Sequence, residues 1–249
     1  MNVPPAGRRS PPPSRAHVLP PDAPMLVLAT PGGTTGVAEE IAAVVRVDNP
    51  QIEVRLTSVT DLADTLPAGR EAVVVPLLTW DDPVVMAEIG KAIAASGSGA
   101  VATEALGPHP LLAEALHIRL AERGLARADR VRLLNVSSPV DAVILGTVGG
   151  ERAVHAVQAT AVLLASRLTL PVVAASLDSE PGVPVAAQRL RAAGAERLAL
   201  APCLIGHEAP VSIVESAAAV IKAGHAQPLG AHSAVAELVA RAYGSQLAT

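Results

Sequence analysis

The chain has 249 residues, a formal net charge of −4 and a hydrophobic fraction of 50%, with no Phe, one Trp and one Tyr. The negative charge and the scarcity of aromatic rings argue against a nucleic-acid partner, and no apolar run approaches the roughly 18 to 20 residues that cross a bilayer. A single cysteine, Cys203, excludes an internal disulfide framework and makes the cytoplasm the simplest expected compartment.

Short runs rich in Val, Leu and Ile alternate with longer segments of helical periodicity, which is typical of βα repeats around a parallel sheet. Residues 1–24 are rich in Pro and Arg, and we expect them to form a disordered tail. The strands expected after this tail are residues 25–30, 52–56, 72–78 and 100–105, then 142–147, 171–175, 197–204 and a short one near 226–229. The expected helices are residues 36–47, 84–95 and 111–123, then 152–168, 184–193, 211–223 and 233–243.

The second part of the chain repeats the first part. The motif at residues 28–33 recurs at 145–150, the one at 75–78 recurs at 201–204, and the one at 106–110 recurs at 229–233. Three echoes in the same order, each at the end of an expected strand, indicate a duplication. The sequence therefore predicts an α/β fold of two homologous halves, residues 25–125 and 141–249, joined by a linker at 126–140.

Glycine-rich loops follow the first strand of each half. Thr30, Gly32 and Gly33 form one loop, and Gly149 and Gly150 occupy the matching positions in the other. Ligands of parallel sheets bind at the carboxyl ends of the strands, and glycine amides at a helix N-terminus could hold an anion such as a carboxylate. A plain glycine turn is the alternative. Neither loop has a nucleotide-binding motif.

Acidic and imidazole side chains follow the third strand of each half. Asp81 and Asp82 occupy these positions in the first half, and His207 and Glu208 occupy them in the second. Oxygen and imidazole ligands suit a divalent first-row metal, and His207 or Glu208 could accept protons from a substrate as the catalytic groups. The alternative is that Asp82 caps a helix that starts at Pro83, and that His207 and Glu208 start the next helix.

The remaining candidate side chains have simpler expected roles. His109 and His232 precede the final helix of each half and are expected to cap or pack. We expect His117 to lie on the surface and His155 on a half-exposed helix face. Cys203 lies in an apolar strand, where a small buried thiol is expected.

Four stretches carry a resemblance to a known family: residues 72–78, 106–113, 185–194 with the strand that follows them, and 229–236. In this order they resemble actinobacterial-type sirohydrochlorin chelatases, over residues 25–243. The resemblance implies two chelatase half-domains, each a parallel β-sheet flanked by helices, with a cleft between them. It also implies a lyase that inserts Fe(II) or Co(II), taken as a substrate, into a sirohydrochlorin-type tetrapyrrole for sirohaem or cobalamin synthesis, without an organic cofactor.

The chain departs from the pattern of that family at the metal-binding positions. Such enzymes carry His-Gly-Ser after the first strand, an acid after the second and a further His after the third. Here these positions fall on Thr30, near Thr60 and Asp61, and on Val84. Two hypotheses follow: either the second half holds the metal through His207 and its neighbours, or the protein is a degenerate homologue that binds tetrapyrrole or metal in a regulatory or carrier role.

Overall fold

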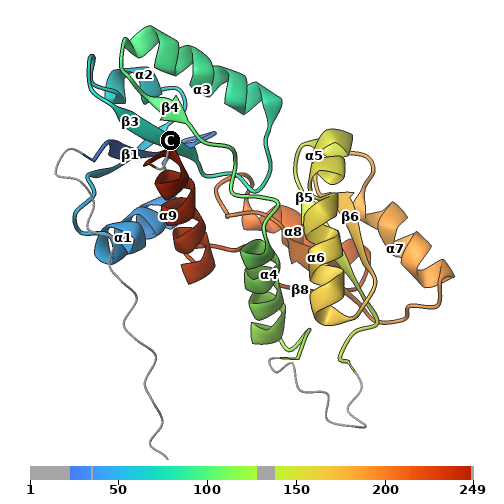
Figure 1. The fold of residues 1–249 in the computed structure, drawn as a ribbon. Coiled ribbons are helices and arrows are strands. Elements are labelled where there is room, and N and C mark those ends of the chain that lie inside the picture. Colours follow the sequence, from blue (N-terminus) through green and yellow to red (C-terminus); the bar gives the residue numbers. More distant parts are fainter. Residues whose placement is uncertain (1–22, 35, 128–137, 248–249) are drawn as a thin grey trace, which may run out of the picture.

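The computed structural model describes residues 23–34, 36–127 and 138–247. It contains two four-stranded parallel sheets, which confirms the predicted α/β fold of two halves (Figure 1). Most of the predicted tail and linker lies outside the described residues. No helix in the described part of the chain is long and apolar enough to span a membrane.

The two sheets have the same strand order. The first runs β2-β1-β3-β4 and the second runs β6-β5-β7-β8. The inner strands are β1 (Met25–Thr30), β3 (Ala72–Pro76), β5 (Ala142–Thr147) and β7 (Leu198–Pro202), and all of their residues are buried. The outer strands are β2 (Val54–Ser58), β4 (Val101–Ala102), β6 (Val172–Ser176) and β8 (Gly224–His225). Continuous Val, Leu, Ile and Ala runs suit the inner strands because helices cover both faces of such sheets.

The strand registers agree with the predicted duplication. Thr30 pairs with Ser58 at the end of the first sheet, as Thr147 pairs with Ser176 at the end of the second. The short strand expected near residues 226–229 is present as β8, which lies just before that position at Gly224–His225. The apolar residues that suggested a strand, Ala226 and Leu229, are instead buried in the loop that follows β8.

The helices of the first half are α1 (Gly36–Asp48), α2 (Leu62–Thr65), α3 (Pro83–Ser96) and α4 (Pro110–Glu122). Those of the second half are α5 (Gly150–Ala156), α6 (Gln158–Leu168), α7 (Val183–Ala192), α8 (Val211–Val220) and α9 (Ser233–Leu247). The single helix expected at residues 152–168 is divided at Val157, whose ψ of 2° departs from that of an α-helix.

The last helix of each half covers the other half. Helix α4 packs on α6 and β7 of the second sheet, whereas α9 packs on α1 and β3 of the first (Figure 1). The expectation that His117 is exposed is therefore wrong, because α6 covers it and leaves only 7% of the residue accessible. Arg167 of α6 donates from Nε to His117 Nδ1 over 3.1 Å and pairs with Glu114 over 3.1 Å. The exchanged helices thus join the two halves.

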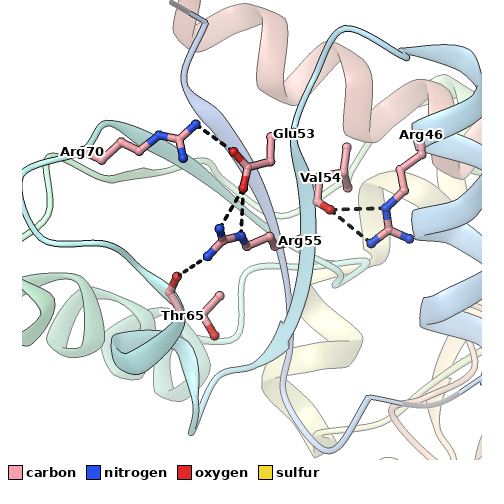
Figure 2. A network of polar contacts seen from close by, with 6 residues as sticks. All are labelled: Arg46, Glu53, Val54, Arg55, Thr65 and Arg70. Carbon is pink, nitrogen blue, oxygen red and sulfur yellow. Dashed lines mark hydrogen bonds and ion pairs between the residues drawn. The ribbon is translucent and has the colours of Figure 1, made fainter.

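A network of charged side chains lies along β2, the outer strand of the first sheet (Figure 2). Glu53 accepts hydrogen bonds from Arg55 at 2.8 Å and from Arg70 at 2.7 Å, while Arg46 donates to the Val54 carbonyl at 3.1 Å. The hydrogen bonds from Arg70 and Arg55 lower the pKa of the Glu53 carboxyl. Charged side chains along an edge strand oppose pairing with another chain, which is the role we assign to this network.

Candidate functional site

The carboxyl ends of the two sheets meet in a region that we call the strand-end junction. Trp80, after β3, lies against the second glycine loop so closely that a Cβ on Gly149 would sit 2.8 Å from Trp80 Cζ2. Gly206, after β7, lies beside Val37 of α1 in the first half. Thr79 donates from Oγ1 to the Cys203 carbonyl over 2.9 Å. The loops that carry the predicted site residues therefore lie along one interface between the halves.

The second glycine loop already holds a carboxylate of its own chain. The Gly149 amide donates to both oxygens of Asp178, at 3.1 and 3.2 Å, and the Ser176 hydroxyl donates to the same carboxylate at 2.6 Å. Partial burial raises the pKa of Asp178, but the hydrogen bonds from Ser176 and Gly149 outweigh it, so the net pKa lies below the ordinary value. Gly149 and Gly150 have φ angles of 108° and 65°, which only glycine adopts readily.

The first glycine loop is open. Gly32 and Gly33 are exposed, and a Cβ on either would meet no atom within 4 Å. Thr30 is fully buried and donates from Oγ1 to the Gly32 carbonyl at 2.8 Å. Thr30 therefore shapes this loop through its hydroxyl, and the two glycines are the part of the loop that a ligand could reach.

The matching threonines differ in hydrogen bonding, because Thr147 Oγ1 is buried with no partner in the structure. Replacing Thr147 by Val is expected to leave the free energy of unfolding unchanged or to raise it, since a buried unpartnered hydroxyl is removed. Replacing Thr30 by Val removes a formed hydrogen bond and is expected to lower that free energy by about 1 kcal/mol. Urea denaturation of the two variants measures the difference, and equal losses would contradict the assigned bonding.

His207 is the unusual side chain at the junction. Both of its ring nitrogens are buried, and neither has a hydrogen-bond partner. A buried polar atom without a partner is costly, and such atoms in native proteins often mark a ligand or a catalytic role. The imidazole can accept a proton or bind a metal without first breaking a bond within the protein.

The three carboxylates predicted beside His207 are bonded to backbone amides. Asp81 accepts from the Ala105 amide at 2.7 Å. Asp82 accepts from the Val84 amide at 2.8 Å and caps α3, which confirms the helix-cap alternative for Asp82. Glu208 accepts from three amides of the preceding loop. The alternative that residues 207 and 208 begin the next helix is wrong, because α8 starts at Val211 after its N-cap residue, Pro210.

The structure forms no ready-made metal cage in the described part of the chain. Across residues 23–34, 36–127 and 138–247, no three His, Cys, Asp or Glu side chains are grouped so that they could hold a metal ion. Cys203 is fully buried, and burial raises the pKa of its thiol to about 12. It therefore stays protonated at neutral pH and is a poor ligand there. His207 offers an imidazole at the junction whose ring nitrogens make no hydrogen bond.

His109 and His232 act as helix caps, as predicted. The Nδ1 atom of His109 accepts from the Leu111 amide and that of His232 accepts from the Ala234 amide, each over 3.1 Å. Desolvation lowers the pKa of both imidazoles, and a nearby arginine lowers each further. Both rings are thus favoured in the neutral form that accepts these bonds.

Sequence reasoning missed two contacts at the junction: Trp80 against Gly149, and Asp178 bonded to the Gly149 amide. Trp80 is the one tryptophan of a chain without phenylalanine, which was the available signal for it. Gly149 and Asp178 are 29 residues apart, so no local pattern indicated their hydrogen bond.

No family model and no curated protein matches the sequence. Among solved structures, the cobalt complex of the sirohydrochlorin chelatase SirB from Bacillus subtilis subspecies spizizenii aligns with a TM-score of 0.61 and 14% identity, covering 89% of this chain and 94% of that one. CbiX, described as the terminal enzyme for sirohaem biosynthesis in denitrifying bacteria, aligns with a TM-score of 0.64 and 17% identity, covering 89% and 98%. The chain therefore shares the fold of these sirohydrochlorin chelatases.

Proposed function

We propose that this chain, which has the fold of the sirohydrochlorin chelatases, is a cytoplasmic tetrapyrrole chelatase that inserts Fe(II) or Co(II) into a sirohydrochlorin-type macrocycle. The observation that supports the proposal is the His207 imidazole, whose two buried nitrogens have no partner at the strand-end junction. The metal is a substrate of the reaction, and no organic cofactor takes part.

The chemistry of insertion explains how one imidazole can be enough. A free-base macrocycle supplies four nitrogen donors, and it releases two N–H protons when it takes up a divalent cation. The protein has to deliver the cation and accept one of these protons, while the other passes to water. A neutral imidazole can serve either need, because its ring nitrogen can bind a first-row metal or accept a proton. His207 therefore acts as the ligand that delivers the metal, or as the base for a pyrrole proton.

The two glycine loops give the junction an asymmetric shape for the substrate. Sirohydrochlorin carries several carboxylates, and the exposed Gly32-Gly33 loop offers room for one of them. The Gly149 amide is bonded to Asp178, so the second half does not offer the same place. We propose that the macrocycle is anchored by the first half and receives its metal from the second.

The test is to mix the purified full chain with sirohydrochlorin and Co(II) or Fe(II) under anaerobic conditions and to follow the absorption of the macrocycle. We expect the free-base spectrum to be replaced by that of the metallated product faster than in a matched mixture without protein. A rate equal to that of the protein-free mixture would refute the chelatase assignment.

A tetrapyrrole or metal carrier is the second candidate. It is favoured by Thr30 and Val84 at positions where the resemblance implies imidazoles, and by the bonding of Asp81 and Asp82 to backbone amides. A carrier would shift the spectrum of sirohydrochlorin on binding without accelerating metal uptake. The same titration without metal therefore separates the two functions.

A further inference from the structure

The carboxylate of Glu208 is wrapped by the loop that carries His207. Its Oε1 accepts from the Ile205 amide at 2.8 Å, and its Oε2 accepts from the amides of Gly206 at 2.7 Å and His207 at 3.1 Å. Both oxygens are therefore engaged by backbone donors. A carboxylate held in this way fixes the backbone from which the imidazole extends.

The matching position in the first half uses its carboxylate in the opposite direction. Asp82 and Glu208 lie at the same distance along the chain after Pro76 and Pro202, the residues that end β3 and β7. Asp82 reaches forward and caps α3, whereas Glu208 reaches back and leaves α8 without a side-chain cap. In the second half the carboxylate therefore orders the loop before α8 and does not stabilise the helix as a cap.

The orientation of the His207 ring depends on the order of this loop, because the ring has no hydrogen bond of its own. Metal-binding histidines are usually oriented by a hydrogen bond from their second ring nitrogen, and His207 has no such bond. Gly206 has a φ of 129°, and a Cβ added to it would sit 3.8 Å from the side chain of Val37 in the other half, so the backbone at this point faces the first half across the junction. The His207 ring is therefore oriented by its packing and by the position of this backbone.

We propose that Glu208 is the positioning residue of His207, and that it acts through the backbone amides rather than as a metal ligand. The positioning role rests on the loop geometry alone. Its expected effect on metal binding also rests on the proposed function. Removing the negative charge should therefore loosen the ring without changing which atoms bind the metal.

The experiment compares the full-length parent with Glu208→Gln, and uses Asp141→Asn as a matched control. Asp141 also accepts two backbone amides in the second half, from Glu196 and Arg197, and pairs with the Arg197 side chain, but it lies just before β5, at the end of the sheet opposite to His207. In Glu208→Gln we expect hydrogen exchange at the amides of residues 205–207 and at the His207 ring Cε1–H to accelerate about tenfold or more. Asp141→Asn should accelerate exchange at residues 196 and 197 only.

Binding of Co(II) alone supplies the second measurement. Glu208→Gln should weaken Co(II) affinity by about 10- to 100-fold while the visible spectrum of bound Co(II) keeps its shape, because the ligand set is unchanged. A changed spectrum would identify Glu208 as a direct ligand and overturn the proposal, as would unaltered ring exchange. If the parent binds no Co(II) but the ring exchange accelerates, the proposed metal chemistry fails and the positioning role stands.

Discussion

His207→Ala is expected to abolish Co(II) binding and to lower the rate of metal insertion by at least about 100-fold, the contribution typical of a general base. Among the described residues, the ring of His207 is the one imidazole with both nitrogens buried and unpartnered. The variant should keep its fold, since it loses no hydrogen bond of the ring, and we expect the free energy of unfolding to change by less than about 1 kcal/mol.

His155→Ala is the control for this prediction. His155 lies on α5, close along the chain to the second glycine loop, and its side chain is exposed. This variant should bind Co(II) and insert it as the parent does. Retention of Co(II) binding by His207→Ala would remove the basis of the proposed chelatase, and the carrier function would then be preferred.

The fold could be predicted because its signals are local or repeated. Inner strands such as β3 and β7 are uninterrupted apolar runs, which is the pattern of a strand covered on both faces. The repeated motif in the two glycine loops predicted that the first strands of the two halves correspond, and the strand pairing agrees with this correspondence. The first signal depends on residues that are neighbours in the sequence, and the second depends on a short motif that occurs twice.

The exchange of α4 and α9 could not be predicted. The apolar face of a helix shows that it packs, but it does not show which sheet it packs on, and α4 has buried residues on more than one side. His117 was misplaced for this reason, because its partner Arg167 belongs to the other half. Only the long-range arrangement of the halves decides such contacts.

The chain positions of the candidate site residues could be predicted, but the hydrogen bonds that these residues make could not. Asp82 followed by Pro83 is a local pattern, and the cap that it predicts is formed. Glu208 has the same place in the other half, yet its longer side chain turns back to the amides before it. The sequence gives the number of residues between the strand and the carboxylate, but it does not give the direction in which the flexible side chain points. The role of Glu208 could therefore be assigned only from the structure.

The exchanged helices should make the two halves unfold together, and Leu116 tests this expectation. Leu116 is fully buried on α4, the helix that leaves the first half to pack on α6. Leu116→Ala opens a cavity there and is expected to lower the free energy of unfolding by about 2 to 5 kcal/mol. Ile118→Ala is the control on the same helix, and it should cost less because Ile118 is 37% exposed.

Urea denaturation followed with two probes measures whether the loss is shared. Fluorescence of Trp80, the one tryptophan, reports on the strand-end junction, while far-ultraviolet circular dichroism reports on the helices of both halves. For Leu116→Ala we expect both transitions to move to lower urea and to remain coincident, because α4 and α9 each tie one sheet to the other. Two separated transitions would show that the halves unfold independently and that the exchanged helices do not couple them.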